Sequence, residues 1–434
     1  FRSIQSIHDE VVSRTRESLH YLDVSIFNHI LSGRIPMKRL FTFILTLTMT
    51  FSFCVNSLAA AATTTTATET TAATAARETS ADTSNTQATG ASYGTSKLSG
   101  APDIVAESAV VMDAGTGTVL YGKEASTKRY PASITKVMTA LLAVENCNMS
   151  DIITYSNAAV NGIEAGSSTA GINVGAKLTV EDSLYALMLV SANEAAAAIA
   201  EHISGSTTEF AKLMTKRAKE LGCKNTQFKN PHGLPDEEHY TTAYDMGLIL
   251  KEAMKHPEFR KIAGTISYTL KKSDSLTDTL ELWNHAKILR QNSDYYYEYA
   301  KGAKTGFTQV ALNTLVTYAK KDNVELICVI LKDHGADKSY TDTANLFKWA
   351  FNQVKAVTPL TNFSLKTAMT ENSSIDSAKL DQIQLLNSSY DTNFSVLVKK
   401  DFDESTLKTA FKLDEDKKTG RLGYIIISCD DKEL

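Results

Sequence analysis

The sequence predicts an α+β fold over residues 101–356, followed by a small all-β domain over residues 357–434. Strand-like segments lie at both ends of the first region, at 108–121 and at 313–331, and the residues between them carry apolar side chains mostly at helical spacing. Strands grouped at the two ends of a domain, with helices between them, favour an antiparallel sheet flanked by helices. Beyond residue 357, short alternating segments at 394–398 and 423–427 indicate further strands.

The N-terminal 100 residues divide into three parts by composition. Residues 1–36 contain no usable motif and are expected to be an upstream extension. Residues 37–61 have a basic start, a 16-residue mostly apolar run and then a segment of small residues, which together predict a signal peptide. The apolar run is shorter than the roughly 20 residues that a membrane-spanning helix needs. Residues 62–100, rich in Thr, Ala and Ser, cannot bury a core and predict a disordered linker. We therefore expect an exported protein whose membrane contact, if any, is through an uncleaved signal.

Composition limits the partners and cofactors. The net charge of −4 and the absence of a basic block argue against a nucleic-acid partner. The five cysteines are scattered without a Cys-x-x-Cys pair, and His-Glu-x-x-His is absent, so we expect isolated thiols, no metal and no cofactor.

The elements of the first domain follow in order. Segments 108–112 and 118–121 flank a Gly-containing turn and predict a hairpin, and a helix is expected to open at or near Ser133. Thr179 and Asp182 have the spacing of a capping box at the start of a helix. Segments 313–318 and 324–331 predict a second hairpin at the edge of an antiparallel sheet. Further helices are predicted over 183–190, 194–200, 210–221, 246–254 and 341–354.

Ser133 and Lys136 are the first candidates for catalysis. On a helix, residues three apart share a face, which places the Lys136 amine beside the Ser133 hydroxyl. A partly desolvated lysine can take the proton of a serine nucleophile, and a helix start favours an oxyanion nearby. Taken alone, the pattern is weak, because Ser405 and Lys408 repeat it in a charged segment and an isolated helix lysine is usually solvated.

Two further motifs follow in the chain. Ser191-Ala-Asn193 lies where one helix ends and the next begins, and Lys304-Thr305-Gly306 enters a strand. In isolation the first is a helix cap and the second an ordinary strand entry. A second Lys-Thr-Gly, at 418–420, lies among charged residues and is interpreted as a turn. His232 and His239 are expected to have structural roles in their loops.

Together and in this order, the three motifs resemble those of penicillin-binding proteins and serine β-lactamases. Their surroundings are similar to the low-molecular-mass D-alanyl-D-alanine carboxypeptidases, over roughly Val105 to Val354. The resemblance rests on the segments Tyr130-Pro-Ala-Ser-Ile-Thr-Lys136, Val190-Ser-Ala-Asn-Glu-Ala195, Asn230-Pro-His-Gly-Leu234, Thr242-Ala-Tyr-Asp245 and Lys304-Thr-Gly-Phe-Thr308. It implies a serine β-lactamase/transpeptidase-like fold for the first domain, in which a helical subdomain accompanies the antiparallel sheet and its flanking helices.

The resemblance also implies a role for each motif residue. Ser133 would be the nucleophile that forms an acyl-enzyme, Lys136 its general base, and Ser191 the group that passes a proton to the leaving amine. The substrate-binding residues would be Asn193, Lys304, Thr305 and Gly306. The backbone N–H groups of Ser133 and Phe307 would form the oxyanion hole.

The implied activity is removal of the terminal D-Ala from peptidoglycan stem peptides ending in D-Ala-D-Ala, with inhibition by β-lactam antibiotics, outside the cytoplasm. Alternatives on the same fold are a peptidoglycan endopeptidase and a β-lactamase; a non-catalytic wall-binding scaffold is less favoured. The Glu-x-x-Leu-Asn of the Glu-assisted β-lactamases is absent, so slow release of penicillin is expected. Residues 309–313 depart from the family pattern, which leaves the shape of that turn and the substrate preference open. The run up to Leu434 gives no support for the amphipathic membrane helix of many relatives.

Overall fold

The computed structural model describes residues 98–272, 276, 278–361, 363, 368, 394–416, 421–429 and 432–433. The predicted upstream extension, the signal peptide and nearly all of the linker therefore lie outside the described residues. Among the described residues, no helix combines the length and the apolar composition needed to cross a bilayer.

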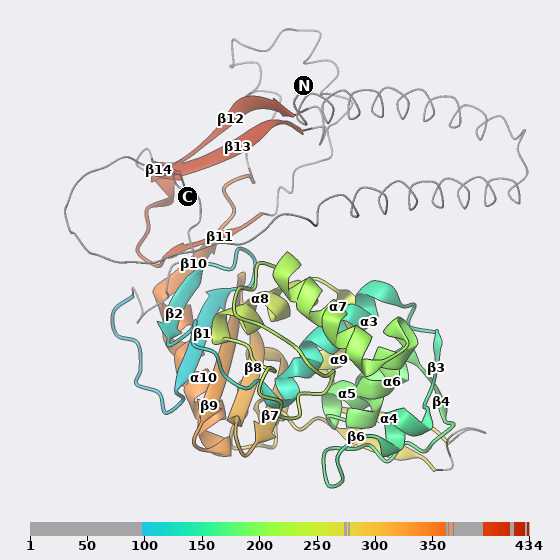
Figure 1. The fold of residues 1–434 in the computed structure, drawn as a ribbon. Helices are drawn as coiled ribbons and strands as arrows, with labels where there is room; N and C mark the ends of the chain where they lie inside the picture. The colour runs from blue at the N-terminus through green and yellow to red at the C-terminus, as the bar shows by residue number, and fades with distance from the viewer. Residues whose placement is uncertain are drawn as a thin grey trace, which may run out of the picture. The chain divides into compact units, whose positions relative to one another are not determined.

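A five-stranded antiparallel sheet forms the centre of the first domain, with strand order β2-β1-β9-β8-β7 (Figure 1). The α+β prediction is confirmed, since both predicted hairpins belong to this sheet. Its strands are β1 (Ser108–Asp113), β2 (Val119–Lys123), β7 (Ala300–Thr308), β8 (Leu312–Lys321) and β9 (Val324–Asp333).

The β8–β9 hairpin lies inside the sheet, so its predicted position at an edge was wrong; β2 and β7 are the outer strands. The run from Leu326 to Leu331 is apolar at every position, and its side chains alternate between the cores on the two faces. Continuous apolar runs of this kind are typical of strands covered on both faces. This signal, present in the sequence, places β9 at the centre.

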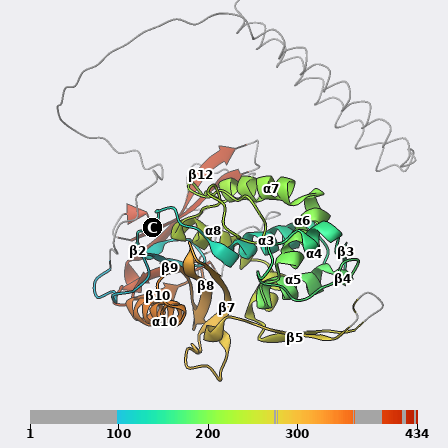
Figure 2. The same ribbon diagram turned by 60° about the horizontal axis from the view of Figure 1, so that its bottom comes forward.

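Helices cover both faces of the sheet. Helix α10 (Ala336–Gln353) packs against β8 and β9 on one face, and α8 (Ala243–Ala253) packs against β1 and β9 on the other, an arrangement that Figure 2 shows from below. The closing helix was predicted from Thr341 and begins five residues earlier. Its N-cap is Gly335, which has no side chain to signal a helix start.

The helical subdomain is built around α3, whose residues Lys136 to Ala143 are all buried. A helix that is buried on every side lies in a protein interior, which explains how a lysine at its start is taken out of water. The subdomain and its connections comprise η1 (Ala132–Thr135), α3 (Lys136–Asn146), β3 (Ile152–Thr154), α4 (Asn157–Asn161), β4 (Lys177–Thr179), α5 (Val180–Leu189), α6 (Asn193–Ser204), α7 (Thr207–Glu220), α9 (Pro257–Gly264), β5 (Ser267–Leu270), β6 (Leu280–Trp283) and η2 (Lys287–Leu289).

Local capping signals agree with the structure. The Thr179 hydroxyl accepts a hydrogen bond from the backbone N–H of Asp182 at the start of α5. The reciprocal half of a capping box does not form, because the Asp182 carboxylate accepts from the Tyr268 hydroxyl instead.

The described part of residues 357–434 contains strands β11 (Val396–Lys399), β12 (Leu407–Asp416), β13 (Arg421–Cys429) and β14 (Lys432–Glu433), with a short turn η3 (Glu404–Thr406). Strand β10 (Val354–Val357) pairs with β11, so the predicted domain limit at 356 falls within a strand. The domain limits remain predictions.

Candidate active site

Ser133 and Lys136 lie side by side where η1 joins α3. Ser133 is in the 3-10 turn, so the predicted helix begins as a tighter turn, and Lys136 is the first residue of α3. The Lys136 Nζ lies 3.1 Å from the Ser133 Oγ. Ala132, immediately before the serine, has a φ of 51°, a left-handed conformation that costs energy for a residue with a Cβ. Such strain is common where a fold presents a reactive group.

The Lys136 amine has two further neighbours, the Asn193 Oδ1 and the His232 carbonyl oxygen, each at 2.7 Å. Both are acceptors only, so Lys136 donates to both. A neutral amine has two N–H bonds and one lone pair. With its two N–H groups directed at these acceptors, its lone pair is left for the Ser133 hydroxyl, the geometry that a general base requires.

Burial favours the neutral form of the Lys136 amine. Loss of water around the amine lowers its pKa well below the usual value, and the positive charge of Lys304 lowers it further, while Glu194 acts in the opposite direction. Repulsion from Lys304 thus contributes to the lowered pKa of Lys136, although burial is the larger cause.

Lys304 is the second buried lysine of the site. Its side chain is 1% exposed, and burial lowers its pKa to about 7. Its Nζ donates a hydrogen bond to the Thr305 carbonyl oxygen at 2.8 Å. At neutral pH the amine is therefore near the midpoint of its titration, and a bound anion would favour its charged form.

Ser191 occupies the connection between α5 and α6, and Asn193 begins α6. Ser191 has a φ of 64°, again left-handed. Its hydroxyl is buried and has no hydrogen-bond partner within the described part of the chain. A buried hydroxyl without a partner is costly, so this group is suited to contact something that enters the site.

Strand β7 passes directly against the nucleophile turn. A Cβ added to Gly306 would lie 2.8 Å from the Ser133 backbone nitrogen and would also clash with the Thr314 hydroxyl. The Thr314 Oγ1 donates to the Pro131 carbonyl oxygen at 2.9 Å and so ties β8 to the same turn. Only glycine permits this approach, which brings the backbone of β7 beside the Ser133 N–H.

The remaining predicted residues lie on the same strand. Thr305 is half-buried, and the Phe307 ring is 60% exposed. An exposed phenylalanine next to a site contributes little to the core, in keeping with a function that rests on its backbone N–H.

Two contributors were missed by the sequence interpretation. The His232 carbonyl is one, and it is positioned by a loop in which the Asn230 Oδ1 accepts from the Gly233 N–H at 2.7 Å. Glu194 is the other: it is 1% exposed, and its Oε1 accepts from the Thr169 hydroxyl and the Ala170 N–H, each at 2.7 Å. Glu194 follows Asn193 directly in the sequence, but nothing there indicates which loop it holds.

The two histidines of this region have structural contacts. Burial lowers the pKa of His232 to about 3 and that of His239 to about 4, so both rings are neutral. The His239 Nε2 lies 2.9 Å from the Thr135 Oγ1, and the His232 Nδ1 accepts from the Leu234 N–H. The His232 ring therefore holds its own loop, and the His239 ring connects its loop to η1 beside the nucleophile.

One group of side chains has the composition of a metal site. Glu145, Glu252 and His256 bring their ligand atoms within 4.8 Å of one another. The Arg217 guanidinium lies 2.6 Å from Glu145 and 3.7 Å from Glu252, and Lys255 pairs with Glu252. These cations already balance the carboxylates, so the group is an ion-pair network.

Comparison with known proteins relates this geometry to a family. The model of peptidase S11, described as D-alanyl-D-alanine carboxypeptidase, matches residues 95–335. The chain belongs to this family.

Individual proteins of known sequence or structure are also similar to this chain. The D-alanyl-D-alanine carboxypeptidase DacF of Bacillus subtilis is 33% identical over 341 residues, which cover 76% of this chain and 83% of DacF. The solved DD-transpeptidase of Streptomyces K15 aligns with a TM-score of 0.54 at 31% identity, covering 58% of this chain and 99% of its own. The D-alanyl-D-alanine carboxypeptidase of Mycobacterium tuberculosis H37Rv aligns with the same TM-score at 26% identity, covering 59% and 95%. The predicted fold class and the predicted serine peptidase are thereby confirmed.

Proposed function

We propose that this S11 peptidase is a D-alanyl-D-alanine carboxypeptidase that removes the terminal D-Ala from peptidoglycan stem peptides through an acyl-enzyme at Ser133. The observation that carries the proposal is the position of the Lys136 amine, 3.1 Å from the Ser133 hydroxyl and held by two acceptors. The DacF relative is named for the same activity.

In the first step, the Ser133 oxygen attacks the carbonyl carbon of the penultimate D-Ala while its proton passes to Lys136. The carbonyl oxygen becomes an oxyanion, which the N–H groups of Ser133 and Phe307 would stabilise. A donor fixed before the reaction begins needs no reorganisation when the charge develops, which is why the close approach of Gly306 to the nucleophile turn matters.

In the second step, the oxyanion collapses and the peptide C–N bond breaks. The proton that Lys136 took from Ser133 passes to the amine of the terminal D-Ala, and Ser191 would relay it, because its buried hydroxyl is free to contact a ligand. Lys136, neutral again, takes a proton from the water that attacks the ester at Ser133, and returns it to the Ser133 oxygen when the ester C–O bond breaks and the shortened peptide is released.

Lys304 and Thr305 would bind the free carboxylate at the end of the substrate, while the Asn193 side chain would hold a substrate amide. A buried cation gives a large preference for a carboxylate, since the pairing takes place away from water. This preference is what distinguishes a carboxypeptidase from an enzyme that cuts within a chain.

β-Lactam antibiotics would acylate the same serine. The Glu194 carboxylate, the buried acid near Lys136, accepts hydrogen bonds from the 169–172 loop. All four bonds end on its Oε1, and its Oε2 is buried without a hydrogen-bond partner among the described residues. We expect the penicilloyl-enzyme to hydrolyse slowly, because the Glu-x-x-Leu-Asn of the Glu-assisted β-lactamases is absent from the sequence.

The site of action would be the extracytoplasmic cell wall, where the protein would serve wall biogenesis and cell shape, with residues 37–61 acting as a signal peptide. Fractionation of cells expressing the full chain tests this part, and retention in the cytoplasm would contradict it.

The decisive experiment compares wild type with Ser133→Ala. Wild type should be labelled by fluorescent penicillin and should release D-Ala from a pentapeptide ending in D-Ala-D-Ala, and the variant should do neither. Labelling that persists in the variant would remove Ser133 as the nucleophile, and rapid penicillin turnover by wild type would favour a β-lactamase.

A further inference from the structure

A cavity of about 420 Å³ lies beside the nucleophile turn and is not used by the mechanism above. One wall is the segment that leads into Ser133, and another is the β7–β8 turn that follows Phe307. It is lined by Lys128, Arg129, Tyr130, Glu237, Tyr240, Val310, Ala311 and Lys332.

The walls of this cavity are tied together by the fold. Arg129 and Thr241 form an antiparallel bridge with backbone hydrogen bonds of 2.8 and 2.9 Å, which joins the segment before Ser133 to the 237–240 loop. On the other side, the Ala311 N–H donates to the Thr308 Oγ1 at 3.0 Å and closes the β7–β8 turn. The cavity is therefore formed before any ligand arrives.

Its lining carries the cations Lys128, Arg129 and Lys332 and one carboxylate, Glu237. A second carboxylate, Glu107, is not part of the lining and lies 3.1 Å from both Arg129 and Lys332. Lys128 lies over the Tyr240 ring at 4.0 Å and, among the described residues, forms no ion pair. The three cations therefore exceed the two carboxylates by one positive charge beside the Ser133 turn.

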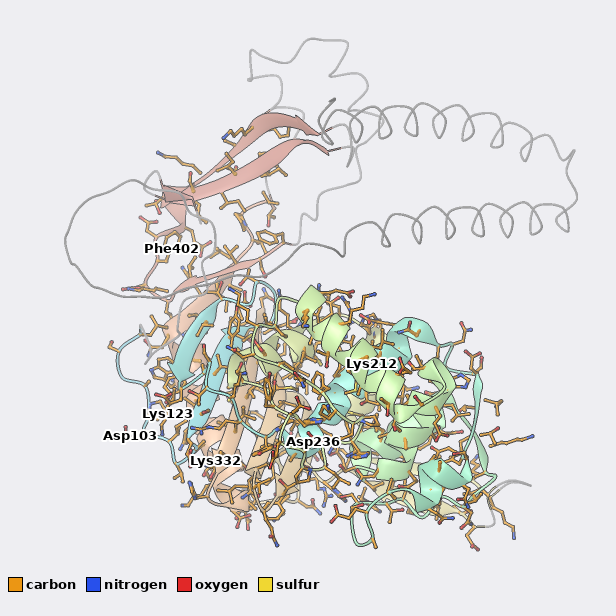
Figure 3. All side chains as sticks on the ribbon, viewed as in Figure 1. Asp103, Lys123, Lys212, Asp236, Lys332 and Phe402 are labelled. Carbon is orange, nitrogen blue, oxygen red and sulfur yellow. The ribbon has the colours of Figure 1, made fainter. Side chains whose placement is uncertain are left out.

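Backbone irregularities direct Lys332 to this place. The pairing of β8 and β9 shifts register between Asn313 and Leu315, opposite the end of β9. Lys332 has a φ of 54°, which is unusual for a residue with a side chain. Bulges near active sites commonly redirect a side chain. Lys332, near the end of β9 and labelled in Figure 3, is one of the residues that line the cavity.

Strand β7 indicates which part of a substrate would reach this cavity. In the proposed function, the terminal carboxylate lies beside Lys304 and Thr305, and the scissile carbonyl lies beside Phe307. The donor peptide then continues toward Val310, three residues further along, about 10 Å at 3.3 Å per residue. That is about the reach of a long side chain on the residue that precedes D-Ala-D-Ala.

We propose that this cavity is a subsite for a carboxylate on the residue preceding D-Ala-D-Ala, bound by Lys128 and Lys332. The proposal rests on the proposed function, since it concerns the same substrate. It also gives a function to part of the segment 309–313, which departs from the family pattern, because Val310 and Ala311 line the cavity.

The test uses three Nα-acetylated tripeptides, X-D-Ala-D-Ala, in which X is 2-aminoadipyl, its side-chain amide or lysyl. The enzymes are the full chain as wild type, Lys128→Ala and Lys332→Gln, with Lys212→Ala as a control that removes an exposed charge on α7 (Figure 3). The measured quantity is kcat/KM for D-Ala release at low and at high salt.

Wild type should prefer the carboxylate over its amide by about fivefold at low salt, and less at high salt, because exposed ion pairs contribute modestly and are screened. Lys128→Ala and Lys332→Gln should each reduce the ratio toward one without changing the rate with the amide, and Lys212→Ala should leave it unchanged. Equal kcat/KM values for the carboxylate and amide peptides in wild type would overturn the proposed subsite but not the proposed carboxypeptidase activity. An unchanged ratio of the two values in both lysine variants would have the same meaning. No release from any peptide would overturn both.

Discussion

Gly306 and Ser133, 173 positions apart in the sequence, are in direct backbone contact: a Cβ on the glycine would lie 2.8 Å from the Ser133 nitrogen. This approach sets the distance between β7 and the nucleophile turn, and with it the position of both proposed oxyanion donors.

Gly306→Ala is therefore expected to lower kcat/KM for D-Ala release by about 10² or more, the usual effect of losing one oxyanion donor. The folded state should remain, with a loss of roughly 1–3 kcal/mol from overpacking. Gly302→Ala is the matched control on the same strand, since a Cβ there meets its nearest atom at 3.4 Å. Equal activity of the two variants would show that the close approach is not needed.

The pH dependence of kcat/KM should be bell-shaped. On the acid side, activity rises as Lys136 loses its proton, at a pH well below the usual range of a lysine because its pKa is lowered. On the alkaline side, activity falls as Lys304, with a pKa of about 7, becomes neutral and no longer attracts the substrate carboxylate. A peptide with an amidated C-terminus lacks that carboxylate, so its profile should lose the alkaline limb. An identical alkaline limb for the two peptides would contradict the role of Lys304.

Asn193→Asp is expected to raise the pKa of Lys136. The substitution places a carboxylate where the Asn193 Oδ1 now accepts from Lys136 at 2.7 Å, and an opposite charge this close raises an amine pKa by about 1–3 units. The acid limb of penicillin acylation should move to higher pH by that amount. Asn193→Ser, which removes the amide acceptor without adding charge, should slow acylation and should not move the limb to higher pH. A limb that moves equally in both variants would exclude the charge effect.

Glu194→Ala should lower the free energy of unfolding by about 2–4 kcal/mol, because the N–H groups of Ala170 and Gly171 lose a buried acceptor. Urea denaturation gives the measurement. Glu209→Ala on α7 is the control, since that carboxylate is 57% exposed in its pair with Lys212 and should change stability by less than about 0.5 kcal/mol. Similar values for the two variants would mean that Glu194 does not hold the loop.

Much of the fold could be predicted because its signals are local. The Thr179 cap and the two sheet hairpins each depend on a few neighbouring residues. The position of the second hairpin was wrong because strand order depends on what covers each face, although the apolar run of β9 contained the hint.

The sequence by itself determined the three motifs, their order and the helices and strands that carry them, since hydrophobic period, caps and turns act over short distances. Only the tertiary structure decided that Lys136 is buried and meets the His232 carbonyl, 96 residues away. It also decided that cations gather beside the Ser133 turn. The reason is physical: a pKa and a charged cavity depend on the water and the charges that surround a group, and residues distant in the chain provide them.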